Sequence, residues 1–322
     1  GEAVVSGVYD RLSLSAGAFG YDTDGYRPNN DLKHEIYNLF GQVAVTPTVN
    51  LQAEYQKRNT KYGDLAMNFD PDDFSPNQRN ELDTESFRVG GTFRPTASST
   101  LLLLYNHKDA DFSQTDEIQL GFLPSPPLPP GLPPILRNDD VAIDAKSDQF
   151  EGSYTFQADM FNLIVGLAHT SVDRDDSLKI EIQDPLAPFP ITVVDDVFDA
   201  DSTDDRGYVY GNINFPSNVT WTLGLSYQDY EEDLYDLNET QPKIGVVWNA
   251  IDNLRLRGAY FEVMKPVLAS NRTLEPTQVA GFNQFFDDID ATRSTRYGLG
   301  ADWKLSESIA VGAEWTRRKL KN

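Results

Sequence analysis

Apolar and polar residues alternate with a period of two along most of the chain. In the clearest run, between positions 219 and 228, one face is made of Val219, Trp221, Leu223, Leu225 and Tyr227. The residues between them are small or polar, and such alternation is typical of a β-strand with one apolar face. Aromatic residues lie near both ends of this face and aliphatic residues lie between them. A strand that crosses a bilayer, with aromatic residues at both interfaces, has this profile.

Thirteen segments show the alternation, and each has about the ten residues that a tilted strand needs to cross the hydrocarbon. They lie near 11–21, 34–46, 49–61, 84–95, 99–111, 147–157, 161–173, 205–215, 218–229, 239–249, 253–264, 292–303 and 308–319. Bacterial single-chain barrels have even strand numbers. Either a final strand is therefore missing, or residues 3–8 add a strand that closes the sheet. We expect about fourteen strands, in a range of roughly twelve to sixteen.

The connections between these segments alternate between short and long. The short ones are 46–48, 95–98, 158–160, 216–218, 250–252 and 305–308. The long ones are near 22–33, 62–83, 112–146, 174–204, 230–238 and 265–291. Outer-membrane barrels sort their connections in this way, with short periplasmic turns and long extracellular loops.

This sorting predicts an all-β fold in the outer membrane of a Gram-negative bacterium. We expect residues 1–322 to form a single domain, a transmembrane antiparallel up-and-down β-barrel with long acidic extracellular loops. Its surroundings would be bilayer lipid and lipopolysaccharide. The sequence also fits a fragment of a longer chain.

Composition narrows the alternatives. Only 39% of the residues are hydrophobic, and no run approaches the roughly 18 apolar residues of a transmembrane helix. A barrel needs no such run, because only alternate residues of each strand face lipid. The net charge of −23 argues against nucleic acid as a partner. The absence of cysteine fits an exported chain, and the N-terminus without a signal peptide fits a mature chain, an excised fragment or a cytosolic protein.

No catalytic constellation emerges from the sequence. The three histidines, His34, His107 and His169, stand on three different segments, and we interpret them as interfacial strand residues rather than ligands. No Ser–His–Asp pattern, phosphate loop or cysteine-based metal site can be assembled. The sequence therefore predicts that the protein is not an enzyme.

The predicted lumen is rich in charge. The pore-lining candidates are Glu54, Arg58, Arg88, Arg94, Glu151, Arg255, Arg257, Arg296, Asp302, Lys304 and Glu314. An interior this charged must be watered or paired across strands. Two interpretations remain open, a water-filled passage with an ionic lining and a cross-lumen network that closes a narrow barrel. A barrel of about fourteen strands is wide enough for water, which favours the passage.

The long loops concentrate acidic residues and one proline-rich tract. Clustered carboxylates are the ligands that Ca²⁺ takes. The candidates for calcium in the extracellular loops are Asp70, Asp72, Asp73, Asp199, Asp201, Asp204 and Asp205. No stretch has the spacing of a known calcium loop, which favours a solvated acidic surface instead. The proline-rich tract at 124–134 predicts a stiff extracellular spacer, with an inward constriction or a partner site as alternatives.

Three stretches carry a family resemblance. They are residues 22–31 (DTDGYRPNND), residues 63–74 (GDLAMNFDPDDF) and residues 272–284 (RTLEPTQVAGFNQ). They resemble the C-terminal barrel of tetratricopeptide-repeat outer-membrane proteins, which is itself similar to TonB-dependent-receptor barrels. The resemblance implies a portion of a longer protein or a shortened relative, since neither repeats nor a plug domain stand before the first strand. It also implies an exit port for polysaccharide or another polymer.

Three functions follow as hypotheses. The leading one is a porin-like outer-membrane pore that passes solutes or a polymer. The second is a barrel that anchors or sheathes a protein partner, such as a periplasmic repeat domain or an electron-carrying cytochrome in its lumen. The third is a surface adhesin that acts through the acidic loops.

Overall fold

The computed structural model describes residues 1–66, 70, 72–120, 133–233, 235–285 and 288–321. Within these ranges the chain forms seventeen strands. The first eight are β1 (Glu2–Tyr9), β2 (Leu12–Thr23), β3 (Leu32–Thr46), β4 (Val49–Tyr62), β5 (Arg79–Thr96), β6 (Ser99–Leu120), β7 (Ile135–Gln157) and β8 (Phe161–Gln183). The others are β9 (Ile191–Asp199), β10 (Ser202–Asn214), β11 (Val219–Glu232), β12 (Tyr235–Ile251), β13 (Leu254–Met264), β14 (Gln278–Val279), β15 (Phe282–Asn283), β16 (Arg293–Lys304) and β17 (Ala310–Lys321). Nowhere in the described ranges is there a helix long and apolar enough to cross a membrane.

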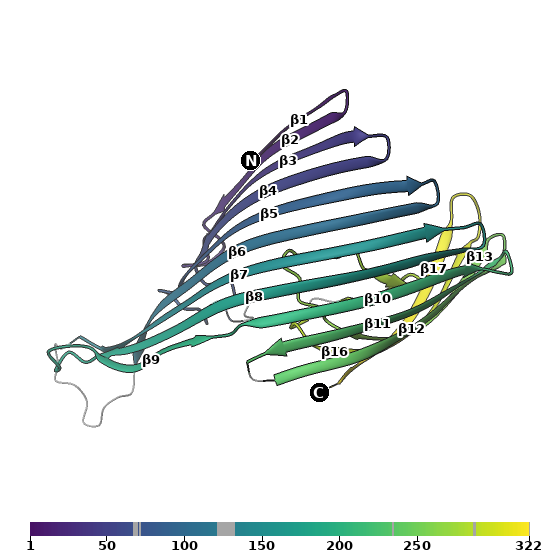
Figure 1. The fold of residues 1–322 in the computed structure, drawn as a ribbon. Coiled ribbons are helices and arrows are strands. Elements are labelled where there is room, and N and C mark those ends of the chain that lie inside the picture. The colour runs from purple at the N-terminus through teal and green to yellow at the C-terminus, as the bar shows by residue number, and fades with distance from the viewer. Residues whose placement is uncertain (67–69, 71, 121–132, 234, 286–287, 322) are drawn as a thin grey trace.

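One antiparallel sheet contains nearly all of these strands. Its order follows the chain from β1 to β8, then runs through β10, β11, β12, β13, β16 and β17. Strand β9 pairs with β8 off this path, and β14 pairs with β15 in a separate hairpin. Figure 1 shows that the sheet curls strongly, with short turns at one end of the strands and long connections at the other.

The two faces of the sheet differ as they do in a membrane barrel. On β11 the apolar side chains point outward, and Leu223 is 46% exposed. The polar side chains between them point inward, and Ser226 is only 4% exposed. An apolar exposed face opposite a polar inner face is the reverse of a soluble sheet and suits contact with lipid. The face assignment made from the alternation at 219–228 is confirmed.

Every one of the thirteen predicted segments overlaps a strand. Three strands were not predicted, β9, β14 and β15, so the described residues contain more strands than the expected fourteen or so. The predicted loops 112–146 and 174–204 are also largely strand, because β6, β7 and β8 extend well beyond the membrane-crossing length. The extensions of β7 and β8 keep an alternation of their own, with Val141, Ile143, Leu178 and Ile180 between small, polar or charged residues, but their acidic composition indicated loops.

Of the two alternatives for the odd number of segments, closure of the sheet by residues 3–8 is wrong for the described residues. These residues do form a strand, β1, but it pairs with β2 alone, and no pairing joins β1 to β17. All residues of β1 are exposed. Both outer strands of the sheet therefore carry backbone groups that need further partners in a bilayer.

Candidate functional site

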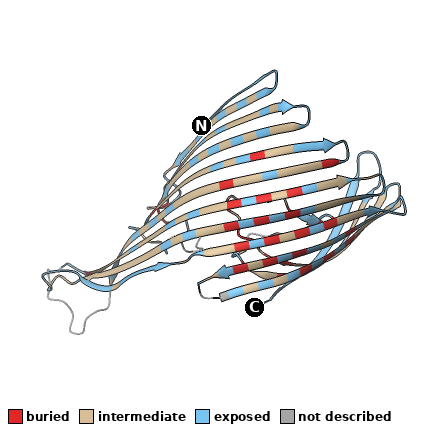
Figure 2. Ribbon diagram, in the orientation of Figure 1, coloured by how far each residue is buried: buried red, intermediate tan, exposed pale blue. Residues whose placement is uncertain are grey.

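The connection between β13 and β16 lies against the inner face of the sheet, although the sequence predicted an extracellular loop there. We call residues 265–292 the inner segment. The backbone N–H of Val267 donates to Asp204 on β10, at 2.7 Å, and that of Ala269 donates to Gln149 on β7, at 3.2 Å. Figure 2 shows that the buried residues gather in the half of the sheet that this segment covers.

The far end of the inner segment reaches β4. Arg272 lies 3.6 Å from the carboxylate of Glu54, which also forms an ion pair with Arg88 on β5. The segment thus leaves the sheet at β13, crosses the inner face as far as β4 and returns to β16. A segment in this position narrows any passage along the inner face.

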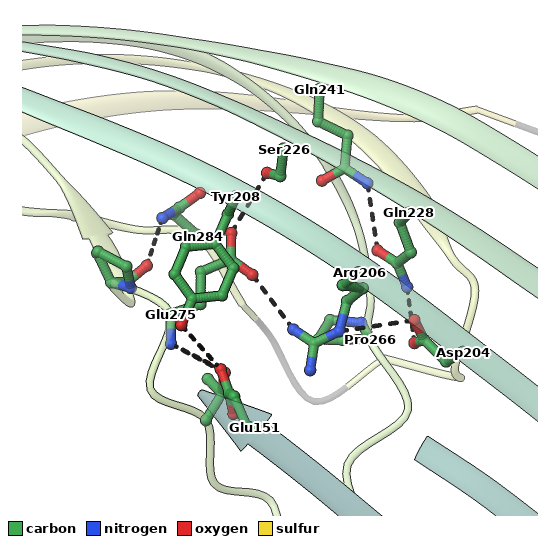
Figure 3. Close-up of polar contacts among 12 residues, drawn as sticks. Glu151, Asp204, Arg206, Tyr208, Ser226, Gln228, Gln241, Pro266, Glu275 and Gln284 are labelled. Atoms are coloured by element: carbon green, nitrogen blue, oxygen red, sulfur yellow. Dashed lines mark hydrogen bonds and ion pairs between the residues drawn. The ribbon is translucent and has the colours of Figure 1, made fainter. Parts of the chain in front are cut away.

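Glu275 is the most heavily bonded residue of the inner segment, and it is only 4% exposed. It accepts hydrogen bonds from Arg206 at 3.2 Å, from the Tyr210 hydroxyl at 2.6 Å and from Ser226 at 3.3 Å. The ammonium group of Lys243 lies 3.8 Å from the same carboxylate. Three neighbouring strands, β10, β11 and β12, therefore hold this one side chain. Figure 3 labels Arg206 and Ser226 beside Glu275.

Asp204 belongs to the same group of buried charges. Its carboxylate lies 3.5 Å from Arg206 and accepts a hydrogen bond from Gln228 at 2.8 Å, besides the one from Val267. With Glu275 there are two carboxylates, and Arg206 and Lys243 supply two cations. Buried charges are tolerated when they are paired and hydrogen-bonded in this way. We call these four residues the ionic anchor.

Glu151 on β7 forms a second attachment. Its carboxylate accepts hydrogen bonds from Tyr208 at 3.1 Å, from the hydroxyl of Thr273 at 2.8 Å and from the backbone N–H of Glu275 at 3.1 Å. It is 4% exposed. Glu151 therefore serves the inner segment as a fixed acceptor rather than as a free pore-lining charge.

The hairpin β14–β15 packs against a part of the inner face of the sheet that is formed by small residues. Its two turn residues, Ala280 and Gly281, both have positive φ, as a tight two-residue hairpin turn requires. Gly245 and Gly298 face the hairpin from β12 and β16, and both are in register with Ala259. A Cβ atom on Gly298 would lie 2.6 Å from the ring of Phe282. This row of small residues leaves the room in which the hairpin sits.

The remaining pore-lining candidates fall into separate groups. Arg257 forms ion pairs with Asp302 at 2.9 Å and with Glu314 at 3.3 Å, and Arg296 donates to the carbonyl of Asn283 in the inner segment. The exposed candidates near the short turns are Arg94, Arg255 and Lys304. Arg58 lies on the inner face of β4, outside the part that the inner segment covers. Their role as pore lining stays a prediction.

The calcium candidates are not brought together. Asp204 is buried in the ionic anchor, whereas Asp205, its neighbour on β10, points to the other face and contacts His169 at 2.8 Å. Asp201 accepts a hydrogen bond from the backbone of Arg174. Among the described residues, no group of three or more acidic or histidine side chains is arranged to hold a metal ion. For the remaining calcium candidates, Asp70, Asp72, Asp73 and Asp199, a calcium site stays a prediction.

The histidines contact separate partners. His34 contacts Thr60 and His107 contacts Asp148, while His169 contacts Asp205. Residues 121–132, which contain most of the proline-rich tract, lie outside the described residues. Its interpretation as a spacer therefore stays a prediction.

Two of the stretches that carry the family resemblance pack against each other beyond the strand ends. Arg27 donates to the carbonyl of Ala66 at 2.7 Å, and Asn30 donates to that of Asp64 at 2.7 Å. Asp64 is buried, which disfavours its ionised form. The backbone N–H groups of Ser75 and Ala66, together with Arg27, nevertheless hold the pKa of Asp64 below its usual range.

Sequence reasoning did not find the ionic anchor. Arg206, Lys243 and the two tyrosines Tyr208 and Tyr210 were not proposed as functional residues. A signal was present, because Asp204, Arg206, Tyr208 and Tyr210 alternate along one face of β10. Glu275 lies in the third resemblance stretch, 272–284, which now has a structural role as the centre of the inner segment.

The family described as "TonB dependent receptor-like, beta-barrel" matches residues 5–322. The chain belongs to this family. No protein with a curated description matches the sequence. The match confirms the TonB-dependent-receptor part of the resemblance and the location in the outer membrane of Gram-negative bacteria.

Solved structures of family members share the fold. The ferripyoverdine receptor of the outer membrane of Pseudomonas aeruginosa, bound to ferripyoverdine, is 14% identical with a TM-score of 0.72, and the match covers 98% of this chain and 46% of that one. The ferric yersiniabactin uptake receptor FyuA from Yersinia pestis is 13% identical with a TM-score of 0.69, covering 99% of this chain and 52% of that one. This TonB dependent receptor-like chain thus spans about half the length of such proteins. Both of these proteins are receptors rather than enzymes.

Proposed function

We propose that the chain forms the wall of an outer-membrane transport barrel, and that the inner segment narrows the path of the solute. The observation that carries this proposal is the ionic anchor, which fixes a long connection across the inner face instead of leaving it outside. Family membership supports transport, and the polar inner face supports a watered path. We treat residues 1–322 as a single domain within this proposal.

The inner face also favours a second candidate, a barrel that sheathes a protein partner. Beyond the inner segment, β3 and β4 present Asn38, Gln42, Gln52 and Gln56 inward, and all four are half-buried. Such amide groups bind a polar protein surface as readily as water. The resemblance to repeat-containing outer-membrane proteins supports this candidate, and it equally supports a polymer as the solute.

Single-channel recording from the complete protein in planar bilayers separates the two candidates. In the test variant, a short Gly-Ser linker replaces residues 266–291. In the control variant, the same linker replaces residues 184–190, between β8 and β9. Transport predicts stable openings, with a larger conductance for the test variant and an unchanged one for the control.

Equal conductance in the two variants contradicts the narrowing. Absence of openings in all forms, with a protein that co-purifies in stoichiometric amount, contradicts the pore and supports the sheath. If neither channel openings nor a co-purifying protein is found, the pore and the sheath are both contradicted.

A further inference from the structure

Three cationic side chains lie on the inner face of β4, β5 and β6, beside the far end of the inner segment. They are Arg58, Arg88 and Lys108. Glu54 contacts Arg272 of the inner segment, so this face of β4 points inward, and Arg58 lies four residues further along the same face. Arg88 is in register with Glu54.

Register places Lys108 on the same face. Ser86 of β5 pairs with Gln56 of β4 on one side and with Lys108 of β6 on the other. Arg58 is close enough to Lys108 for its charge to act on the ammonium group. The inner segment adds Arg272, and we call Arg58, Arg88, Lys108 and Arg272 the cationic patch.

The charge of the patch is not balanced by the protein. One carboxylate, that of Glu54, lies against both Arg88 and Arg272. Among the described residues, neither Arg58 nor Lys108 has an ion pair or a hydrogen bond, and the Nε atom of Arg58 is buried without an acceptor. Four cations thus face a single carboxylate, in a chain whose net charge is −23.

The side chains around the two unpaired cations are uncharged. Gln56, Ser86 and Ser147 stand in register with Lys108, and Ile36, Thr84 and Ala110 stand in register with Arg58. Half-buried cations without a counter-charge are unfavourable unless a ligand supplies one. An arginine guanidinium matches the oxygens of a carboxylate or phosphate, and a lysine adds a point charge.

We propose that the cationic patch binds a solute with two or more carboxylate or phosphate groups. Strands β4 and β6 lie about 10 Å apart, two strand spacings, so a solute with two anionic groups can engage both of the unpaired cations, one from each strand. The inference deepens the proposed transport function, because the patch lies on the path that the inner segment narrows. The acidic remainder of the protein repels such solutes, which makes the patch the favourable place on the inner face.

Isothermal titration calorimetry of the complete protein in detergent, at low salt, tests this proposal with inorganic pyrophosphate as the probe. Arg58→Gln and Lys108→Gln are each expected to weaken binding by about tenfold or more. Lys108→Arg, which keeps the charge, retains most of the affinity. The matched control is Lys57→Gln, which removes the same charge from the adjacent position on β4, but on the outer face.

The proposal is overturned if pyrophosphate does not bind at millimolar concentration, or if Lys57→Gln weakens binding as much as Arg58→Gln. Heat-modifiable gel migration verifies that every variant is folded. Calorimetry does not depend on conduction. Binding by a protein that shows no channel openings would therefore support the anion site and contradict the pore. Channel openings without binding would support the pore and contradict the anion site.

Discussion

Tyr210 on β10 donates a 2.6 Å hydrogen bond to Glu275, a residue 65 positions further along the chain. Both side chains are buried, so water does not compete for this contact. A hydrogen bond to a charged group contributes about 1.5–3 kcal/mol. The bond joins a membrane-crossing strand to the centre of the inner segment, and it makes that segment part of the wall.

Replacing Glu275 with glutamine is expected to loosen the inner segment. The amide keeps the shape of the side chain but leaves Arg206 and Lys243 with only Asp204 as a counter-charge. Breaking a buried ion pair by removing one partner costs about 3–5 kcal/mol. Limited proteolysis in detergent should therefore cut the variant within residues 265–292 at a protease concentration that spares the wild type.

The control for this experiment is Glu314→Gln. Glu314 also pairs with an inner-face arginine, Arg257, but its side chain is 44% exposed. An exposed pair contributes about 0–1 kcal/mol, so this variant should resist the protease as the wild type does. Equal resistance of the two variants would show that the ionic anchor does not hold the segment.

Gly298→Ala is expected to displace the hairpin β14–β15. The new Cβ atom would lie 2.6 Å from the ring of Phe282, and that ring is fully buried. Overpacking of this kind costs about 1–3 kcal/mol. The midpoint of guanidinium unfolding in detergent should fall, and channel conductance should rise if the hairpin narrows the path.

Gly258→Ala is the matched control on the neighbouring strand β13. Gly258 faces outward, and the nearest atom to its added Cβ lies 3.6 Å away, an ordinary contact distance. Its unfolding midpoint should stay near that of the wild type. A loss of stability in this variant as large as in Gly298→Ala would assign the effect to strand glycines in general.

The membrane-crossing strands could be predicted because lipid imposes a strict rule on them. Every second residue of β11, for example, must be apolar, and this requirement is written locally in the sequence. The extensions of β6, β7 and β8 run beyond the membrane-crossing length, and although part of them alternates, as at Leu178, Ile180 and Ile182, their many charged residues indicated loops by composition. Their pairing follows from the hairpins that they continue, which hydrophobic alternation does not reveal.

The inner segment could not be predicted, because its contacts are distant in sequence. Nothing local at Val267 indicates that its backbone will meet Asp204, and nothing local at Arg272 indicates Glu54. The acidic residue Asp204 was grouped with the loop aspartates on composition alone, although its place on an alternating strand separates it from Asp205. Alternation was the better guide to its role.

The contact between residues 24–31 and 63–78 should weaken in acid. The pKa of Asp64 is lowered in the folded protein, so its ionised form contributes stability that is present above its usual pKa of 3.8. That contribution is lost as the pH falls through the lower, folded pKa. Hydrogen exchange of the Ser75 N–H, corrected for intrinsic rates, should lose protection below pH 3.8 in the wild type.

Asp64→Asn removes the titrating group and should show weaker protection that does not change over this range. Asp31→Asn is a suitable comparison, because Asp31 pairs with Arg79 nearby but its side chain is 44% exposed, whereas Asp64 is buried. It should keep the acid transition of the wild type. If the transition persists in Asp64→Asn, another carboxylate is responsible for it.

Five aspartates face one another in a single row across β5 to β9, at positions 83, 111, 144, 175 and 199. Like charges directly opposite each other weaken strand pairing. A hydrogen bond between the carboxyl groups of Asp175 and Asp199, and the negative charge of Asp175, raise the pKa of Asp199 above its ordinary value. Strand β9, which pairs with β8 alone, therefore pairs in spite of the repulsion between these carboxylates.

Asp175→Asn is expected to strengthen the pairing of β8 with β9. The wild type should gain protection of the β9 amides as the pH falls through the raised pKa of Asp199, because protonation removes the repulsion. In Asp175→Asn the repulsion is already absent, so protection at neutral pH should be about two- to fivefold higher and should vary less with pH.

Asp173→Asn provides the opposite case, since Asp173 stands across from Lys146 rather than from an aspartate. Its loss should weaken the pairing of β7 with β8 and leave the acid response of the β9 amides intact. An equal gain of amide protection in both variants would mean that total charge, and not the aspartate row, limits the protection of β9.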